Sequence, residues 1–199
     1  MILYVETNFL MSIATGRDSQ ANTLLQNPTA SVQIAIPSIC CMESLSALED
    51  QIKRRNRFMN ELNNQISQLR RDVTSSHAKS LLSHLEQSLI ENEALLNDVE
   101  NRLFQVLDHL NTKAEMIPLT GDMLQESLDT RLIEKDPTDN LILHCILNHA
   151  RLHPTDRKVF LSANVKEFKL LQVQAALQNA GVVKYLTCTQ DFFGWLQTP

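Results

Sequence analysis

Acidic side chains follow the apolar segments of this chain at several separate places. Met1 to Val5 is a continuous apolar run, as expected of a strand buried in a parallel sheet, and Glu6 follows it directly. Glu43, Asp139 and Glu167 stand near the starts of later helical segments. Because ligands of open α/β sheets bind outside the carboxyl ends of the strands, these carboxylates could share one site at that edge.

Each acid also has an ordinary structural explanation. Thr7 or Asn8 could cap the helix that follows, Phe9 to Ala14. Glu43 and Glu167 suit the first turns of helices, where the helix dipole favours negative charge. Asp136 precedes Pro137 and would therefore cap the next helix. Since that helix already has a cap, capping explains Asp139 less well.

The acidic segments together predict a metal site, because clustered carboxylates repel one another unless a cation neutralises them. Oxygen ligands without His or Cys select a hard cation, Mg²⁺ or Mn²⁺. Such an ion holds a phosphodiester, polarises it and lowers the pKa of an attacking water. The six histidines show no H-E-x-x-H or His/Cys ligand spacing, so we expect them to be ordinary helix and loop residues.

The elements that must position these acids alternate between strands and helices. After the first strand, helical periodicity fills most of the sequence between further short apolar runs. Such alternation predicts a parallel α/β sheet. The later strands are expected at Val32–Ile36, Glu115–Ile117, Lys158–Leu161 and Val182–Leu186.

Residues 45–111 are different, because they carry two heptad series typical of coiled-coil packing. A polar break at residues 74–77 separates the series, so we expect an antiparallel helical hairpin projecting on the order of 45 Å. Aligning the series places the polar exceptions Arg55 and Asn92 opposite Val99 and Leu62, which would specify register. The first series is Leu45, Leu48, Ile52, Met59, Leu62, Ile66, Leu69 and Val73; the second is Leu82, Leu85, Leu89, Leu96, Val99, Leu103, Val106 and Leu110.

Composition limits the function classes. The 199 residues suit one α/β domain that the hairpin interrupts at about residues 45–111, and a hydrophobic fraction of 43% allows a real core. Four glycines in the whole chain exclude a Gly-rich phosphate loop. A net charge of −5 opposes a generally basic nucleic-acid binder. Four cysteines without a C-x-x-C pair, and no apolar run of membrane-spanning length, predict a cytoplasmic protein with reduced thiols.

Four short segments carry acids, hydroxyls and amides in a defined order along the chain. They are Val5-Glu6-Thr7-Asn8-Phe9-Leu10, Glu43, Asp136-Pro137-Thr138-Asp139-Asn140-Leu141-Ile142-Leu143 and Leu161-Ser162-Ala163-Asn164-Val165-Lys166-Glu167-Phe168. In this order they resemble the motifs of the PIN-domain family of metal-dependent ribonucleases. Two residues depart from the family pattern, because Glu6 stands where Asp is usual and Asn164 where Asp is frequent.

The resemblance implies a parallel sheet of four to five strands sandwiched by helices, and a site built from three groups of residues. Glu6, Glu43 and Asp139 would bind the principal Mg²⁺ or Mn²⁺ ion and carry catalysis. Asp136, as a further metal ligand, would form the outer part of the site or a second metal position with Asn164 and Glu167. Thr7, Asn8 and Ser162 would orient ligands or water by hydrogen bonds.

We therefore expect an endoribonuclease that hydrolyses RNA with a metal-activated water. The alternative is a catalytically weak PIN-like module that binds protein or RNA through the hairpin. Basic residues on the first arm could guide RNA or could equally form a solvated, cross-paired face; they are Lys53, Arg54, Arg57, Arg70 and Arg71. An antitoxin-like or other protein partner and a homodimer formed through the hairpin are further expectations.

Overall fold

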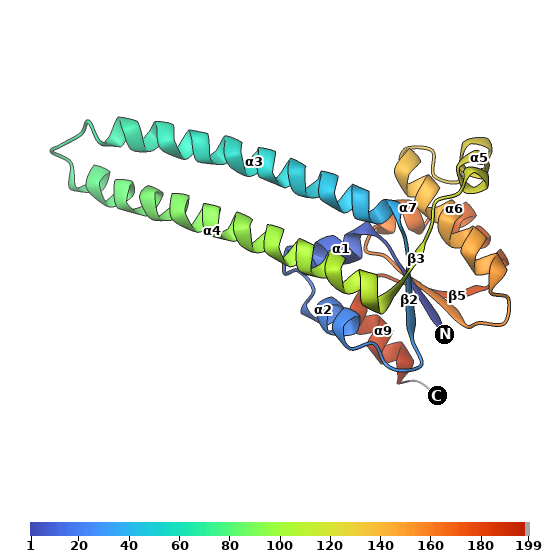
Figure 1. The fold of residues 1–199 in the computed structure, drawn as a ribbon. Coiled ribbons are helices and arrows are strands. Elements are labelled where there is room, and N and C mark those ends of the chain that lie inside the picture. The colour runs from blue at the N-terminus through green and yellow to red at the C-terminus, as the bar shows by residue number, and fades with distance from the viewer. Residues whose placement is uncertain (198–199) are drawn as a thin grey trace.

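The computed structural model describes residues 1–197, which fold around a five-stranded sheet with all strand pairs parallel (Figure 1). The strand order is β3-β2-β1-β4-β5, which confirms the expected parallel α/β architecture. The strands are β1 Ile2–Val5, β2 Gln33–Pro37, β3 Ala114–Ile117, β4 Lys158–Leu161 and β5 Val182–Leu186. The helices are α1 Thr7–Ala14, α2 Ser19–Gln26, α3 Ile39–Leu69, α4 Ser76–Lys113, α5 Gly121–Asp129, α6 Pro137–Leu152, α7 Val165–Phe168, α8 Leu171–Asn179 and α9 Thr189–Leu196.

The strand order creates a switch point at the carboxyl edge of the sheet. From β1 the chain passes to β2 and β3 on one side, and later to β4 and β5 on the other. The order therefore reverses between β1 and β4, which is where open α/β sheets bind ligands. Val5 pairs with Leu161, so the residues that follow these strand ends, Glu6 and Ser162, emerge next to each other at this edge.

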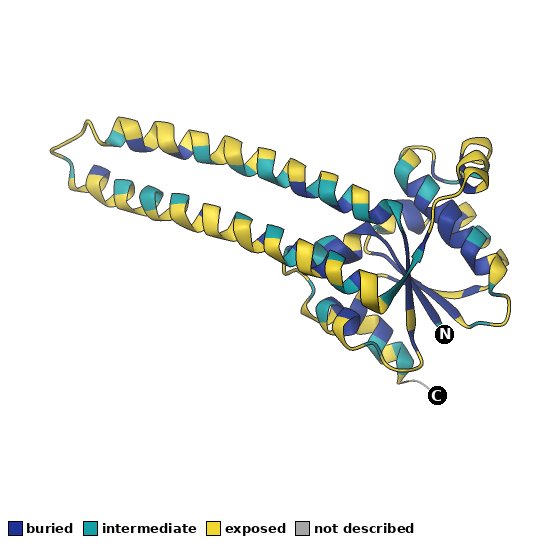
Figure 2. Ribbon diagram, in the orientation of Figure 1, coloured by how far each residue is buried: buried dark blue, intermediate teal, exposed yellow. Residues whose placement is uncertain are grey.

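Helices cover both faces of the sheet. Helix α6 packs on β2 and β3, and α5 packs on α6. On the opposite side lie α1, α2, α9 and the base of α4, where α1 contacts α4 and α2 contacts α9 (Figure 1). Strands β1 and β4 are buried along their whole lengths (Figure 2). This central position explains the uninterrupted apolar run Ile2–Val5.

Helices α3 and α4 form an antiparallel hairpin that projects from the sheet (Figure 1). Most residues of its outer part are exposed, whereas its base is buried (Figure 2). Leu48, Leu103 and Leu110 belong to the same buried cluster as the strands, so the hairpin grows directly out of the core. In the described part of the chain, no helix, including these two long ones, combines the length and hydrophobicity that crossing a bilayer requires.

The tip of the hairpin differs from the expected heptad alignment. Val73 is 73% exposed rather than paired with Leu82, because α3 ends at Leu69. Asp72 then accepts hydrogen bonds from the backbone N–H groups of Thr74 and Ser75, at 3.1 and 3.0 Å. These Asx-type bonds form a turn, which removes Val73 from the helical surface.

The polar residues of the hairpin also pair differently from the expectation. Arg55 Nη1 donates to Asn92 Oδ1 at 2.6 Å, so the two exceptions contact each other, a pairing that the heptad alignment did not include. Asn92 is buried, and no residue in the described part of the chain gives its Nδ2 a hydrogen-bond partner. The long guanidinium arm allows Arg55 to reach this acceptor between the helices. The heptad alignment did not predict this contact, because it pairs residues by their positions along the two helices and takes no account of side-chain length.

We predict that Arg55→Leu lowers the free energy of unfolding by about 1–3 kcal/mol, because it leaves the buried Asn92 amide without a partner. Combining Arg55→Leu with Asn92→Leu should restore stability to at least the wild-type value, because the buried polar group is then replaced by an apolar one. Urea denaturation of the wild type, both single variants and the double variant measures this coupling. A double variant as unstable as Arg55→Leu would contradict the prediction.

A candidate metal-binding active site

Glu6 lies at the end of the central strand and caps helix α1. Its Oε2 accepts the backbone N–H of Asn8 at 2.7 Å, so the cap is Glu6 itself rather than the polar residues after it. The residue is 1% exposed, and its buried Oε1 has no hydrogen-bond partner among the residues that the structure describes. A buried carboxylate oxygen without a donor is costly, and a cation is the kind of ligand that would satisfy it.

Glu43 reaches the same edge from the second turn of α3. The Thr7 hydroxyl donates to Glu43 Oε2, which joins the start of α1 to the start of the hairpin. Glu43 is half-buried, and its pKa is raised, first by burial and also by the charge of Asp136. The contact explains how Thr7 could orient an acid that comes from a distant part of the sequence.

Asp139 and Asn164 meet across the crevice. Asn164 Nδ2 donates to Asp139 Oδ2 at 2.6 Å, which connects the first turn of α6 to the segment after β4. Asp139 is 6% exposed. Asp136 caps α6 as expected, with its Oδ1 accepting the N–H groups of Thr138 and Asp139 at 3.0 and 3.1 Å. Capping occupies Oδ1 of Asp136, so only its Oδ2 would remain for a metal.

The other predicted site residues are Ser162, Glu167 and Asn8, and each makes a different contact. Ser162 Oγ accepts the backbone N–H of Asn164 at 3.0 Å and shapes the turn after β4. Glu167 is buried, and its Oε1 lies 3.0 Å from Lys166 Nζ. Asn8 is exposed and meets the site through its backbone N–H rather than its side chain. Within residues 1–197 the Asn8 side chain makes no hydrogen bond to the acids.

The pKa values of the acids at this site are raised, because burial and neighbouring negative charges disfavour their ionised forms. Burial raises the pKa of Glu6 to about 7, while the Asn8 N–H and the Ser162 hydroxyl oppose this effect only in part. Burial also raises the pKa of Asp139 to about 7, with further contributions from the charges of Asp136, Glu43 and Glu167. A divalent cation would reverse both shifts by favouring the ionised forms. The oxygen-only donor set and the unpaired Glu6 Oε1 therefore fit Mg²⁺ or Mn²⁺.

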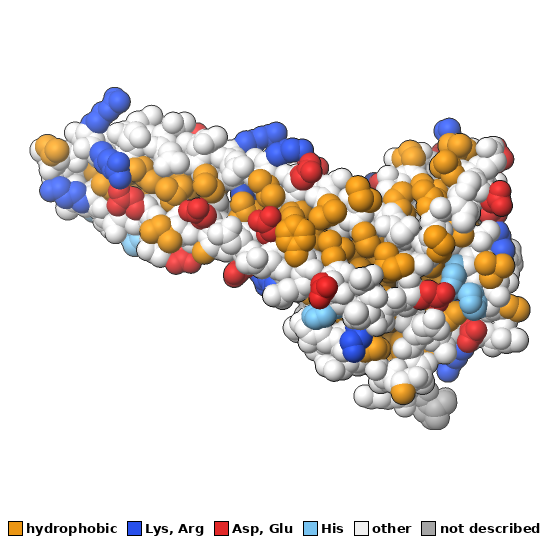
Figure 3. All heavy atoms as spheres, viewed as in Figure 1, with side chains coloured by type: hydrophobic (Ala, Val, Ile, Leu, Met, Phe, Trp, Pro, Cys, Tyr) orange, Lys and Arg blue, Asp and Glu red, His pale blue; other side chains and the backbone are white. Residues whose placement is uncertain are grey.

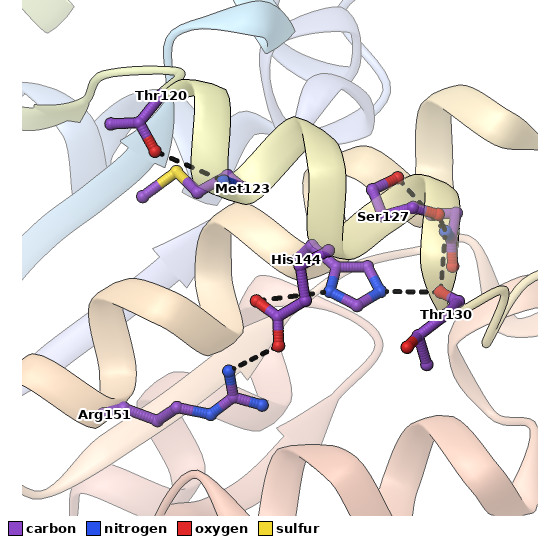
Figure 4. A network of polar contacts seen from close by, with 8 residues as sticks. Thr120, Met123, Ser127, Thr130, His144 and Arg151 are labelled. Carbon is purple, nitrogen blue, oxygen red and sulfur yellow. Dashed lines mark hydrogen bonds and ion pairs between the residues drawn. The ribbon is translucent and has the colours of Figure 1, made fainter.

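A buried polar network behind the site fixes the start of α6 (Figure 4). Asn140 follows Asp139 directly and is 2% exposed. Its Oδ1 accepts the Ile133 N–H at 3.0 Å, and its Nδ2 donates to Ser127 O at 2.9 Å and Thr130 O at 3.2 Å. These bonds tie α5 and the loop after it to the residue beside Asp139. They make Asn140 a positioning residue that the sequence did not distinguish from the rest of its motif.

His144 and Arg151 extend this network along α6 (Figure 4). His144 Nε2 lies 2.9 Å from Thr130 O, and His144 Nδ1 lies 3.7 Å from Glu126 Oε2. Arg151 Nη1 donates to Glu126 Oε1 at 2.8 Å. The interactions hold α5 against α6 and so brace the helix that carries Asp139.

A second cluster of ligand-type side chains lies away from the acids. Within residues 1–197, Glu115, His149 and His153 form the only trio of His, Cys, Asp or Glu whose ligand atoms all lie within 4.8 Å of one another. The acids of the sheet edge are therefore more widely spaced. The expectation that the histidines lack metal-ligand spacing missed this trio. His149 and His153 are four residues apart in the sequence, which was a usable signal, whereas Glu115 is brought to them only by the fold.

We predict that, without divalent ions, the free energy of unfolding falls as pH rises from about 5 to 7.5. The unfolded chain loses the Glu6 proton near 4.5 while the native state holds it up to about 7, so the native state binds more protons in this window. The loss attributable to Glu6 is on the order of 3 kcal/mol. Urea denaturation in a chelator should show a smaller decrease for Glu6→Gln than for wild type, and an unchanged one for the exposed Glu49→Gln. Equal decreases in all three would contradict this.

Comparison with known proteins gives the family. The model of the PIN domain matches residues 3–168, from the first strand through the hairpin to the segment that carries Asn164 and Glu167. Neither the curated proteins nor the solved structures compared with the chain contain a significant match. The family match covers more than half of the chain and agrees with the parallel five-stranded sheet. The chain therefore belongs to the PIN domain family.

Proposed function

We propose that this protein is a metal-dependent endoribonuclease. PIN domains are generally nucleases, they typically depend on divalent metal ions, and they typically act on RNA. The observation that supports the proposal is that the charges of Asp139 and Glu43 raise the pKa of Glu6, the charge of Glu43 raises that of Asp139, and the buried Glu6 Oε1 has no hydrogen-bond partner within the described residues. A purely structural site would not be expected to gather buried acids whose pKa values rise together.

We assign the metal to these three carboxylates, with Asp136 as an outer ligand. When bound, Mg²⁺ or Mn²⁺ would polarise the phosphodiester and lower the pKa of an attacking water. Thr7 holds Glu43 by a hydrogen bond, and Asn164 holds Asp139. Both act as positioning residues, because their donors fix carboxylates in one orientation.

Asn164 has a specific effect at this position. An amide donates to Asp139 where an acid would repel it, so Asn164 lowers the local negative charge while keeping the carboxylate oriented. Glu6 compensates on the other side, because its longer arm caps α1 through one oxygen and leaves the second free. The two departures from the family pattern are therefore compatible with a metal site.

Part of the hairpin's basic surface supports RNA binding. Lys53 lies 3.3 Å from Asp50, and Arg70 lies 2.8 Å from Glu86, so these two charges are already paired. Arg54 lines an open hollow of about 600 Å³ with Arg17 and Arg55. Figure 3 shows basic side chains at the tip of the hairpin and midway along its upper edge, and apolar ones between its arms.

The hollow lies near enough to the acids for one RNA segment to reach both. Arg17 follows the end of α1, and Glu6 caps the start of the same helix, which spans about 12 Å. We therefore assign phosphate contacts to Arg54, which lines the hollow, and to Arg57, an exposed residue three positions further along α3; neither forms an ion pair within the described residues. Lys53 and Arg70 are expected to contribute less, since each already neutralises an acid.

Cleavage of labelled RNA with Mn²⁺ tests the catalytic proposal. Glu43→Gln and Asp139→Asn should each reduce the rate about 100-fold or more, because each removes a charge that holds the metal and the reacting phosphate. Matched controls are Glu49→Gln, on the same helix as Glu43, and Asp122→Asn, another first-turn acid. If wild type and both site variants behave alike, the enzymatic proposal is wrong and binding through the hairpin becomes the better explanation.

RNA affinity measured against salt concentration tests the hairpin assignment. The double variant Arg54→Ala/Arg57→Ala should weaken binding and reduce the salt slope by about 0.7 for each phosphate that the protein no longer neutralises. Lys53→Ala/Arg70→Ala removes the same charge and should change the slope less, because both residues are paired within the chain. Equal effects of the two double variants would contradict the assignment.

A further inference from the structure

We propose that Glu115, His149 and His153 bind a divalent transition metal ion, Zn²⁺ in the first place, at a second centre separate from the carboxylate edge. Their ligand atoms all lie within 4.8 Å of one another. Two imidazoles and a carboxylate form a donor set that suits Zn²⁺, whereas the oxygen-only edge suits Mg²⁺ or Mn²⁺. This inference does not depend on the proposed nuclease activity.

The hydrogen bonds of His153 leave one ring nitrogen free for a metal. His153 Nδ1 lies 2.9 Å from the backbone oxygen of His149. A carbonyl oxygen only accepts, so Nδ1 must carry the proton and Nε2 keeps its lone pair in the neutral ring. This arrangement, with the second nitrogen held by a backbone carbonyl, is how metal-ligating histidines are usually oriented.

His149 is oriented in a comparable way. Its Nδ1 lies 2.9 Å from the Tyr4 hydroxyl, which is buried in the central strand, and its Nε2 lies 3.1 Å from Glu115 Oε1. The His149 and His153 rings stack with their centroids 4.2 Å apart. The neutral ring carries a single proton, so Nε2 can bind a metal only in the tautomer that holds this proton on Nδ1, where Nδ1–H donates to the Tyr4 oxygen.

Glu115 completes the set from the edge strand. Its Oε2 accepts from Gln33 Nε2 at 2.7 Å, which orients the carboxylate so that Oε1 faces His149. The Glu115 side chain is 35% exposed and that of His149 is 8% exposed, so the site opens to solvent on the Glu115 side. In Figure 3, histidine and acidic side chains adjoin at the surface over the region of β3 and α6. The opening provides an entry path and a position for a water ligand.

The position of this centre indicates a structural role. Glu115 lies two residues after the end of α4, and His149 and His153 lie at the end of α6. A bound ion would clamp the strand that leaves the hairpin to the helix that carries Asp139. His149 is ten residues from Asp139 along α6, or about 15 Å, so the two centres do not share ligands.

Zn²⁺ binding to the chelator-treated full-length protein tests the proposal. Competition with a chromophoric chelator should reveal one Zn²⁺ that Mg²⁺ does not displace, and Co²⁺ should give the visible absorption of an imidazole-ligated ion. His153→Ala and Glu115→Gln should each weaken Zn²⁺ binding at least about tenfold. The controls are His84→Ala, an exposed histidine on α4, and Asp139→Asn, which alters the carboxylate edge; both should bind Zn²⁺ as the wild type does.

Thermal unfolding supplies a second readout. Zn²⁺ should raise the Tm of wild type, His84→Ala and Asp139→Asn but not that of Glu115→Gln. Glu115→Gln decides the matter if His153→Ala fails to fold, because Glu115 is partly exposed and its amide replacement preserves the shape. Absence of Zn²⁺ binding by wild type would overturn the proposal. Loss of binding in Asp139→Asn alone would also overturn it, because the ion would then lie at the carboxylate edge.

Discussion

The structure depends on one costly feature, the buried carboxylate of Glu6 at the end of the central strand. Burial raises the pKa of this group to about 7, and the charges of Asp139 and Glu43 act in the same direction. The Asn8 N–H bonds Oε2 and the Ser162 hydroxyl offsets part of the rise, but Oε1 has no hydrogen-bond partner within residues 1–197. Such a residue persists only if the surrounding fold is stable enough to hold it, or if a cation completes its environment. The site and the fold are therefore linked through the same group.

Helix α6 connects the main polar features of the molecule. Asp136 caps it, its first turn carries Asp139 and Asn140, and His144 and His149 follow toward its end. Asn140 and His144 bond α5 and the following loop, which fixes the helix against rotation. Most of the helix is buried, so it can move only as a unit. A displacement at its first turn would therefore disturb the packing at its last turn. This rigidity is what a precise carboxylate geometry requires.

The hairpin is structurally continuous with the site. Helix α3 runs without interruption from Ile39 to Leu69, and Glu43 lies in its second turn. Thr7 joins Glu43 to the start of α1, while the base of α4 packs on α1. The direction in which the hairpin projects and the direction in which Glu43 points are consequently set by the same helix. A partner that bound the outer part of the hairpin would therefore contact the same helix that carries Glu43.

Local patterns in the sequence determined the parallel sheet, the hairpin and the segments that carry the acids. An apolar run such as Ile2–Val5, a proline after Asp136 and a long heptad series each report on neighbouring residues, so they can be recognised one by one. The tertiary structure alone decided which distant side chains meet. It joined Asn164 to Asp139, Arg55 to Asn92, and Glu115 to His149, over separations of 25, 37 and 34 residues. Such contacts depend on chain path and side-chain reach, which no local periodicity contains.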